Sequence, residues 1–205
     1  MDLTVVNPRS RELNRSLSQE HRLECLVTDE KRVYERLIAP LESRMMRTIW
    51  RVVRHPQLAE DTLQEALTTI WKKLKRIRLH PHPEALILKI CLNAAYDSLR
   101  KSGRSQKVKD PAFFQKFPAS FKETIPQELE SKEMKDEIHN AISQLPRKQA
   151  VAVLMRIAQD LPYDAIAQAM NCSASTVRIH VSRGRKRLSQ RLAHLLSTPS
   201  KETSA

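Results

Sequence analysis

The chain has 205 residues, and its 36 lysines and arginines against 23 acidic residues give a net charge of +13. Two glycines are too few for a turn-rich β fold, and three widely spaced cysteines exclude a disulfide framework. The basic charge favours a polyanionic partner, nucleic acid or an acidic membrane surface. Leucine, alanine, lysine, arginine and glutamate are abundant, so we expect an all-α protein. The N-terminus lacks the apolar run of a signal peptide, and no run has the length of a membrane span, so we expect a cytoplasmic protein.

After a polar arm at residues 1–27, residues 28–101 are predicted to form a first helical domain. Apolar residues recur there at helical spacing in two stripes separated by His55-Pro56, and a third helix at 84–100 follows Pro81 and Pro83. The stripes are Leu37, Leu41, Met45, Ile49 and Val52, then Leu63, Leu67, Ile70, Trp71 and Leu74. The third helix is apolar on almost every side, which is typical of a central core helix.

Residues 102–127 are predicted to be a flexible linker, because Gly103 and three prolines interrupt any periodicity. This segment contains all four phenylalanines of the chain: Phe113, Phe114, Phe117 and Phe121. They either pack on the chain's own domains or dock into a groove of a partner.

Helical periodicity returns at residues 128–196, before a tail at 197–205 that we expect to be disordered. Two apolar stripes come first: Ile138, Ala141, Ile142 and Leu145, then Ala150, Val153, Leu154 and Ile157. Residues 161–188 then predict a short helix capped by Asp160, a left-handed turn at Asn171 and a longer helix capped by Ser173. This order is typical of a helix-turn-helix that binds duplex DNA.

The longer helix of this motif has a polar and basic outer face. If Val177, Val181, Leu188 and Leu192 are buried, the outward residues are Ser175, Thr176, Arg178, Ile179, Ser182, Arg183, Lys186 and Arg187. Hydroxyl groups near a helix N-terminus suit phosphate, and arginines can bind guanine edges in the major groove. The alternative is a solvated basic helix in an ordinary bundle.

The first domain has two further polar features. Asp61, Gln64 and Glu65 share one helical face, which by itself is most simply a solvated surface. Asn93 is a lone amide in the apolar third helix, either satisfied inside the bundle or presented to a base, and Arg100, Lys101 and Arg104 follow it. These basic residues could hold a nucleic-acid backbone.

Three segments occur in the order found in bacterial RNA polymerase sigma factors: residues 59–71, the Asn-Ala-Ala-Tyr-Asp-Ser-Leu-Arg run from Asn93, and residues 145–188. The chain resembles the small two-domain extracytoplasmic-function (ECF) type over about 33–101 and 132–192. The resemblance implies a region 2-like domain at 28–101, a region 4-like helix-turn-helix domain at 128–196, and core RNA polymerase and promoter DNA as partners. An anti-sigma factor is a further implied partner.

The same resemblance assigns roles to residues. Asp61, Gln64 and Glu65 would bind the polymerase, and Asn93, Asp97, Arg100 and Lys101 would bind the −10 element as a single strand. The −35 element would be read by Ser175, Thr176, Arg178, Ile179, Ser182, Arg183 and Arg187. Leu86-Ile87 stands where the family usually has Trp-Leu, and Ala165, Asn171 and Ile179 also depart from common residues, so we expect the promoter preference to differ from that of relatives.

The alternative function is a free-standing helix-turn-helix regulator that acts without polymerase. An enzyme is not expected, because the sequence has no glycine-rich phosphate loop, no carboxylate cluster and no nucleophile paired with a base. No catalytic, cofactor or metal site is expected either, since no further ligand spacing supports His80 and His82.

Overall fold

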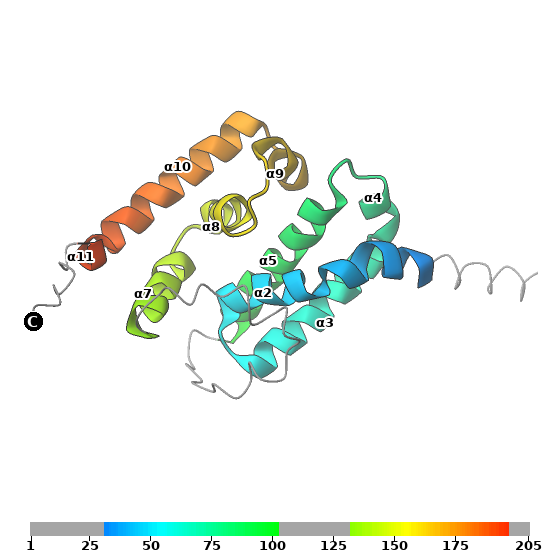
Figure 1. Cartoon of the computed structure of the whole chain (residues 1–205), viewed down its shortest axis with the longest axis horizontal. Coiled ribbons are helices and arrows are strands. Elements are labelled where there is room, and N and C mark those ends of the chain that lie inside the picture. Colours follow the sequence, from blue (N-terminus) through cyan, green and yellow to red (C-terminus); the bar gives the residue numbers. More distant parts are fainter. Residues whose placement is uncertain (1–30, 103–131, 197–205) are drawn as a thin grey trace, which may run out of the picture. The chain divides into compact units, whose positions relative to one another are not determined.

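A computed structural model describes residues 31–102 and 132–196, and these residues are helical with short turns between helices (Figure 1). The predicted all-α class is confirmed, and residues 163–191 form the helix-turn-helix. Every helix in the described ranges is too short or too polar to cross a lipid bilayer. The N-terminal arm, the linker with its phenylalanines, Arg104 and the C-terminal tail lie outside these ranges. The predicted domain boundaries therefore stay a prediction.

Contacts divide the chain into two compact units, Met1–Glu42 and Ser43–Ala205. The described end of the first unit contains a π-helical turn, η1 (Tyr34–Ile38), and a 3-10 turn, η2 (Ala39–Leu41). The continuous helix predicted through Leu37 and Leu41 is therefore wrong in this part. Pro40 explains the irregularity, because it has no N–H to donate and its ring clashes with the preceding turn of an α-helix.

The second unit begins in α2 (Glu42–Val53) and continues through α3 (Pro56–Lys72), α4 (Leu74–Arg78) and α5 (Pro83–Lys101). Arg54 has a positive φ of 54° where α2 ends. The imidazole of His55 then caps α3 by accepting a hydrogen bond from the Leu58 N–H at 3.2 Å. Pro56 and Pro83 stand at the first turns of their helices, where a missing N–H costs nothing.

The buried face of α3 differs from the predicted stripe. Its buried residues are Ala59, Thr62, Ala66 and Ile70, whereas Leu63 and Leu67 are half-buried and Trp71 is 36% exposed. Small residues let α3 approach α5 closely, and the Thr62 hydroxyl donates to Ser98 Oγ at 2.9 Å between the two helices. The periodicity predicted the helix correctly but assigned its larger apolar side chains to the buried face. A sequence pattern does not show how closely a neighbouring helix packs, and here close packing buries the small residues instead.

The α5 helix is the core helix that the sequence predicted. Its buried residues lie on several sides: Ala85, Leu86, Ile87, Leu88, Ile90, Cys91, Leu92, Ala95 and Ser98. The buried thiol of Cys91 has a pKa raised to about 12, because no solvent is present to stabilise its thiolate.

The C-terminal helices are α7 (Lys132–Ser143), α8 (Arg147–Val153), the π-helical turn η4 (Leu154–Ala158), α9 (Tyr163–Met170), α10 (Ala174–Arg191) and α11 (Ala193–Leu196). Ile157 was predicted to continue the buried stripe of Leu154, but it is 57% exposed. The π turn explains this error, since its wider hydrogen-bonded ring changes the residue spacing on which the stripe was predicted.

Candidate nucleic-acid interface

The helix-turn-helix has the turn that its sequence predicted. Asn171 adopts the left-handed conformation, with φ 55° and ψ 52°, immediately after α9. Ser173 Oγ accepts a hydrogen bond from the Thr176 N–H at 3.2 Å and so caps α10. Val177 and Val181 are buried, and Leu188 and Leu192 are half-buried. The turn, the cap and the inner stripe therefore follow from local sequence chemistry.

The predicted cap of α9 is wrong. Pro162 occupies the position before α9, with no side-chain cap, and Asp160 has a positive φ of 48°. Asp160 instead accepts a hydrogen bond from Arg156 at 2.6 Å, across the π turn. An aspartate just before a helix favours a cap, but here the chain needs two more residues to leave the π turn before α9 can start.

The outer face of α10 carries the residues that the sequence assigned to duplex DNA. Ser175, Arg178, Ile179, Ser182, Arg183, Lys186 and Arg187 are exposed, and Thr176 is half-buried. The side chain of Ile179 is 49% exposed, which places an apolar group among basic ones. This face is an open, positively charged helix surface of the kind that enters a major groove.

Tyr163 is a residue of this surface that sequence reasoning missed. The guanidinium carbon of Arg178 lies 5.1 Å from the centre of its ring, and that of Arg156 lies 5.4 Å away. Both distances suit a cation–π contact. Tyr163 therefore orients one of the predicted base readers, and an aromatic residue at the start of the first motif helix was the available signal.

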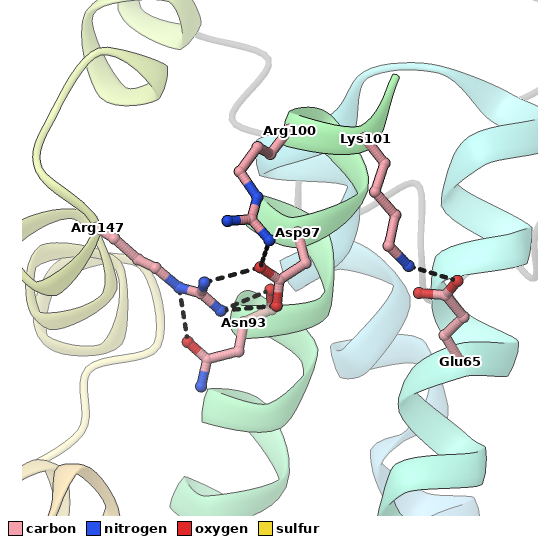
Figure 2. Close-up of polar contacts among 6 residues, drawn as sticks. All are labelled: Glu65, Asn93, Asp97, Arg100, Lys101 and Arg147. Atoms are coloured by element: carbon pink, nitrogen blue, oxygen red, sulfur yellow. Dashed lines mark hydrogen bonds and ion pairs between the residues drawn. The ribbon is translucent and has the colours of Figure 1, made fainter. Parts of the chain in front are cut away.

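The acidic face of α3 is solvent-exposed at Asp61, Gln64 and Glu65. Gln57 donates to Asp61 at 3.4 Å, and Lys101 of α5 pairs with Glu65 at 3.4 Å. A residue assigned to polymerase binding thus lies beside one assigned to the −10 strand, as Figure 2 shows. These contacts are surface contacts of small energetic value, so the side chains are available to a partner.

The α5 residues Asn93 and Asp97 are half-buried and bound by an arginine from the C-terminal helices (Figure 2). Arg147 Nε donates to Asn93 Oδ1 at 3.2 Å, and its Nη2 donates to the Asn93 carbonyl at 3.0 Å. The same guanidinium donates to the two Asp97 carboxylate oxygens at 2.8 and 3.0 Å. Neither interpretation of Asn93 anticipated this, because the partner is 54 residues away in sequence.

The charge around Asp97 explains its ionisation. The hydrogen bonds from Arg147 lower the pKa of its carboxyl group, and the charges of Arg147, Arg100 and Lys101 lower it further. Arg100 itself lies 3.8 Å from Asp97 and is exposed. Residues of α3, α5 and α8 line a cleft of about 510 Å³. They include Glu65, Asn93, Arg100, Lys101 and Arg147.

Comparison with known proteins assigns both halves of the chain. The family model of sigma-70 region 2 matches residues 37–105, and that of sigma-70 region 4 matches residues 135–188. The chain belongs to the sigma-70 family, as a sigma factor of the ECF type. Sigma factors are transcription initiation factors and not enzymes.

Two curated sigma factors are similar over most of their length. The RNA polymerase sigma-H factor of Pseudomonas aeruginosa is 28% identical over 186 residues, which cover 85% of this chain and 93% of that protein. The ECF RNA polymerase sigma-E factor of Haemophilus influenzae is 20% identical, over 88% of this chain and 98% of that protein.

The fold of this sigma factor is also found in a solved structure. The sigma factor RpoE of Bartonella quintana, in complex with the anti-sigma factor NepR, matches with a TM-score of 0.56 and 20% identity. The match covers 78% of this chain and 96% of that one. In this sigma factor the acidic α3 face and Asn93 lie within region 2, and the exposed α10 face lies within region 4.

Proposed function

We propose that this sigma factor binds core RNA polymerase through Asp61, Gln64 and Glu65 and directs it to promoters with a −10 and a −35 element. The observation that carries the proposal is the pairing, in one chain, of an exposed acidic α3 face with an exposed basic recognition helix. The acidic face is unsuited to DNA because phosphates repel carboxylates, so it fits a protein partner. The α10 face fits the DNA.

Run-off transcription tests this function. Purified core polymerase and the full chain are incubated with genomic fragments, and the transcripts are sequenced at their 5′ ends. We expect initiation at a small set of promoters that share two elements. Start sites no different from those of core polymerase alone would contradict the proposal, and the transcripts obtained would also give the promoter sequence.

The variant Gln64→Ala/Glu65→Ala tests the polymerase face. Both side chains are exposed, so the variant should fold normally but bind core polymerase about tenfold more weakly, a loss of roughly 1.4 kcal/mol. Asp164→Ala, which removes an exposed carboxylate from α9, is the matched control and should bind like the wild type. Equal co-purification of all three proteins with core enzyme would remove the assignment of this face.

A gel shift distinguishes this function from that of a free-standing helix-turn-helix regulator, the alternative considered from the sequence. Such a protein should shift promoter duplexes in a gel without polymerase, whereas a sigma factor should need the core enzyme for a tight complex.

An anti-sigma factor is a further proposed partner, since the solved relative RpoE is bound to NepR. Its test is whether a protein co-purifies with the full chain and is displaced by core polymerase.

A further inference from the structure

Ile179 is an exposed apolar side chain in the middle of the outer face of α10. Its side chain is 49% exposed, whereas Val177 and Val181, two residues before and after it, are buried. Because an α-helix has 3.6 residues per turn, residues two apart point to opposite sides of the helix. Ile179 therefore takes no part in the buried stripe that packs α10 on the other helices, and it is available to a partner.

Polar side chains surround Ile179 on this face. Ser175 lies one turn before it, Ser182 and Arg183 lie one turn after it, and all three are exposed. Residues three and four apart on a helix are neighbours, so a partner that contacts Ser182 and Arg183 also meets the isoleucine. Under the proposed function, that partner is the major groove of the −35 duplex.

Thymine is the base whose major-groove edge suits an isoleucine. Guanine and adenine present polar atoms there, and cytosine presents an amino group, whereas thymine adds a C5-methyl group to its O4 acceptor. An aliphatic side chain placed on a polar base edge removes water from that edge without returning a hydrogen bond, which costs free energy. Contact with the methyl group instead removes apolar surface from water on both sides. The chemistry of Ile179 thus selects thymine.

The side chain of Ile179 also suits a contact of fixed geometry. A β-branched residue has one strongly preferred χ1 rotamer in a helix, so little conformational entropy is lost when it binds. The guanidinium of the preceding residue, Arg178, is held over the ring of Tyr163 at the start of α9, with 5.1 Å between the guanidinium carbon and the ring centre. Ile179 therefore presents a rigid apolar group beside a guanidinium that an aromatic ring restrains.

We propose that Ile179 gives the −35 element a thymine at one position by contacting its 5-methyl group. The inference rests on the proposed function, because it takes the outer face of α10 as the surface that meets the −35 duplex. It adds the identity of one base, and the selectivity that it assigns to Ile179 comes from a methyl group and not from charge.

Replacement of thymine by uracil tests the contact, because it removes only the 5-methyl group and keeps the pairing with adenine. A promoter obtained by run-off transcription is made with a single uracil at each −35 thymine in turn, on either strand. Binding of the holoenzyme, formed from core polymerase and the full chain, is measured by fluorescence anisotropy. At one position we expect an affinity about fourfold lower with uracil, the effect of one buried methyl-sized group. This ratio should be the same at two salt concentrations, since no phosphate contact is lost.

Two variants assign the effect to Ile179. Ile179→Ala should bind the thymine duplex and the uracil duplex equally, at about the affinity of the wild type for the uracil duplex. Ile157→Ala is the matched control, because it removes an isoleucine that is 57% exposed on η4, outside α10, and it should keep the wild-type ratio. Both positions are exposed, so both variants should fold normally, which circular dichroism checks.

Failure of this inference is distinguishable from failure of the proposed function. If the full chain gives core polymerase no promoter-specific initiation, the proposed function is contradicted, and the role of Ile179 with it. If initiation is promoter-specific but no −35 thymine loses affinity when uracil replaces it, the role of Ile179 alone is overturned. A uracil effect that persists undiminished in Ile179→Ala would overturn that role as well.

Discussion

At the scale of single residues, the outward-facing side chains determine the chemistry of the α10 surface. One aromatic neighbour, Tyr163, restricts the orientation of Arg178. Arg178 lies over the ring of Tyr163, so part of its freedom is removed before DNA is met. Arg183, one and a half turns further along, is exposed and unrestrained by any ring contact in the described residues. Arg178 is therefore oriented before it contacts DNA, whereas the side chain of Arg183 can adapt its orientation to the DNA.

Arg183→Ala should lower the discrimination between a matched and a mismatched −35 element by about 1–3 kcal/mol, because a bidentate contact to a guanine is lost. Holoenzyme binding to both duplexes, measured by fluorescence anisotropy at one salt concentration, gives the ratio. Arg185→Ala removes an exposed arginine that lies nearer the buried stripe of the same helix, and it should leave the ratio unchanged. An identical loss in both variants would show that only general charge is read.

The described cysteines should differ in reactivity. Cys91 is buried and its pKa is raised to about 12, whereas Cys172 is half-buried at the helix-turn-helix turn. Since thiolate is the reactive form and little of it forms below the raised pKa, iodoacetamide near neutral pH should modify Cys172 and spare Cys91 in the folded protein. Peptide mass spectrometry with and without urea checks this. Rapid modification of Cys91 without urea would contradict the packing of α5.

At the scale of elements, the meeting of α8 and α10 depends on Gly184. A Cβ atom at this position would lie 2.5 Å from Val153 Cγ2 and 3.5 Å from the Gln149 carbonyl oxygen. Val153 cannot swing away easily, because a β-branched side chain has one favoured rotamer in a helix. The glycine thus lets the recognition helix pack closely on its support.

Gly184→Ala should lower the free energy of unfolding by about 1–2 kcal/mol, since the overpacking cost exceeds the gain in helix propensity. Urea unfolding followed by circular dichroism measures it. The same substitution made in a Val153→Ala background should cost much less, because the methyl group that it meets has been removed. Equal costs in the two backgrounds would show that the Val153 contact is not the cause.

Element prediction succeeded where local chemistry decides and failed where a neighbour decides. Ser173 and Asn171 act within one turn of chain, so their roles could be predicted. The π turn after Val153 and the small-residue face of α3 depend on packing against other helices. Ile157 and Trp71 were therefore predicted to be buried, but both are exposed to solvent.

At the scale of the whole described chain, the buried residue Gln159 joins the end of η4 to α2, two segments that are more than 100 residues apart in the sequence. Its side chain and carbonyl accept from Arg44, and its amide donates to Thr48. Removing the side chain leaves one donor, Arg44 Nε, and one acceptor, the Thr48 hydroxyl, without these partners, while the bond from Arg44 to the Gln159 backbone carbonyl can remain. This gives the residue a role in the folded state that its sequence position did not suggest.

Gln159→Ala should lower the free energy of unfolding by about 1–3 kcal/mol, because the partners of a buried amide lose their hydrogen bonds. Gln168→Ala, an exposed glutamine on α9, is the control and should change stability by about 0.5 kcal/mol or less. Urea unfolding of the three proteins provides the comparison. If the two variants are equally stable, the side-chain hydrogen bonds of Gln159 with Arg44 and Thr48 contribute nothing to the stability of the fold.

The sequence by itself determined the helical class, the helix-turn-helix and the exposed faces of α3 and α10, since caps, turns and periodicity act within a few residues. It also carried the family, through the order of its motifs. Only the tertiary structure decided that Arg147 holds Asn93 and Asp97 and that Arg44 holds Gln159. Such pairs join side chains 50 to 115 residues apart, and no local pattern records which distant donor will meet a given acceptor.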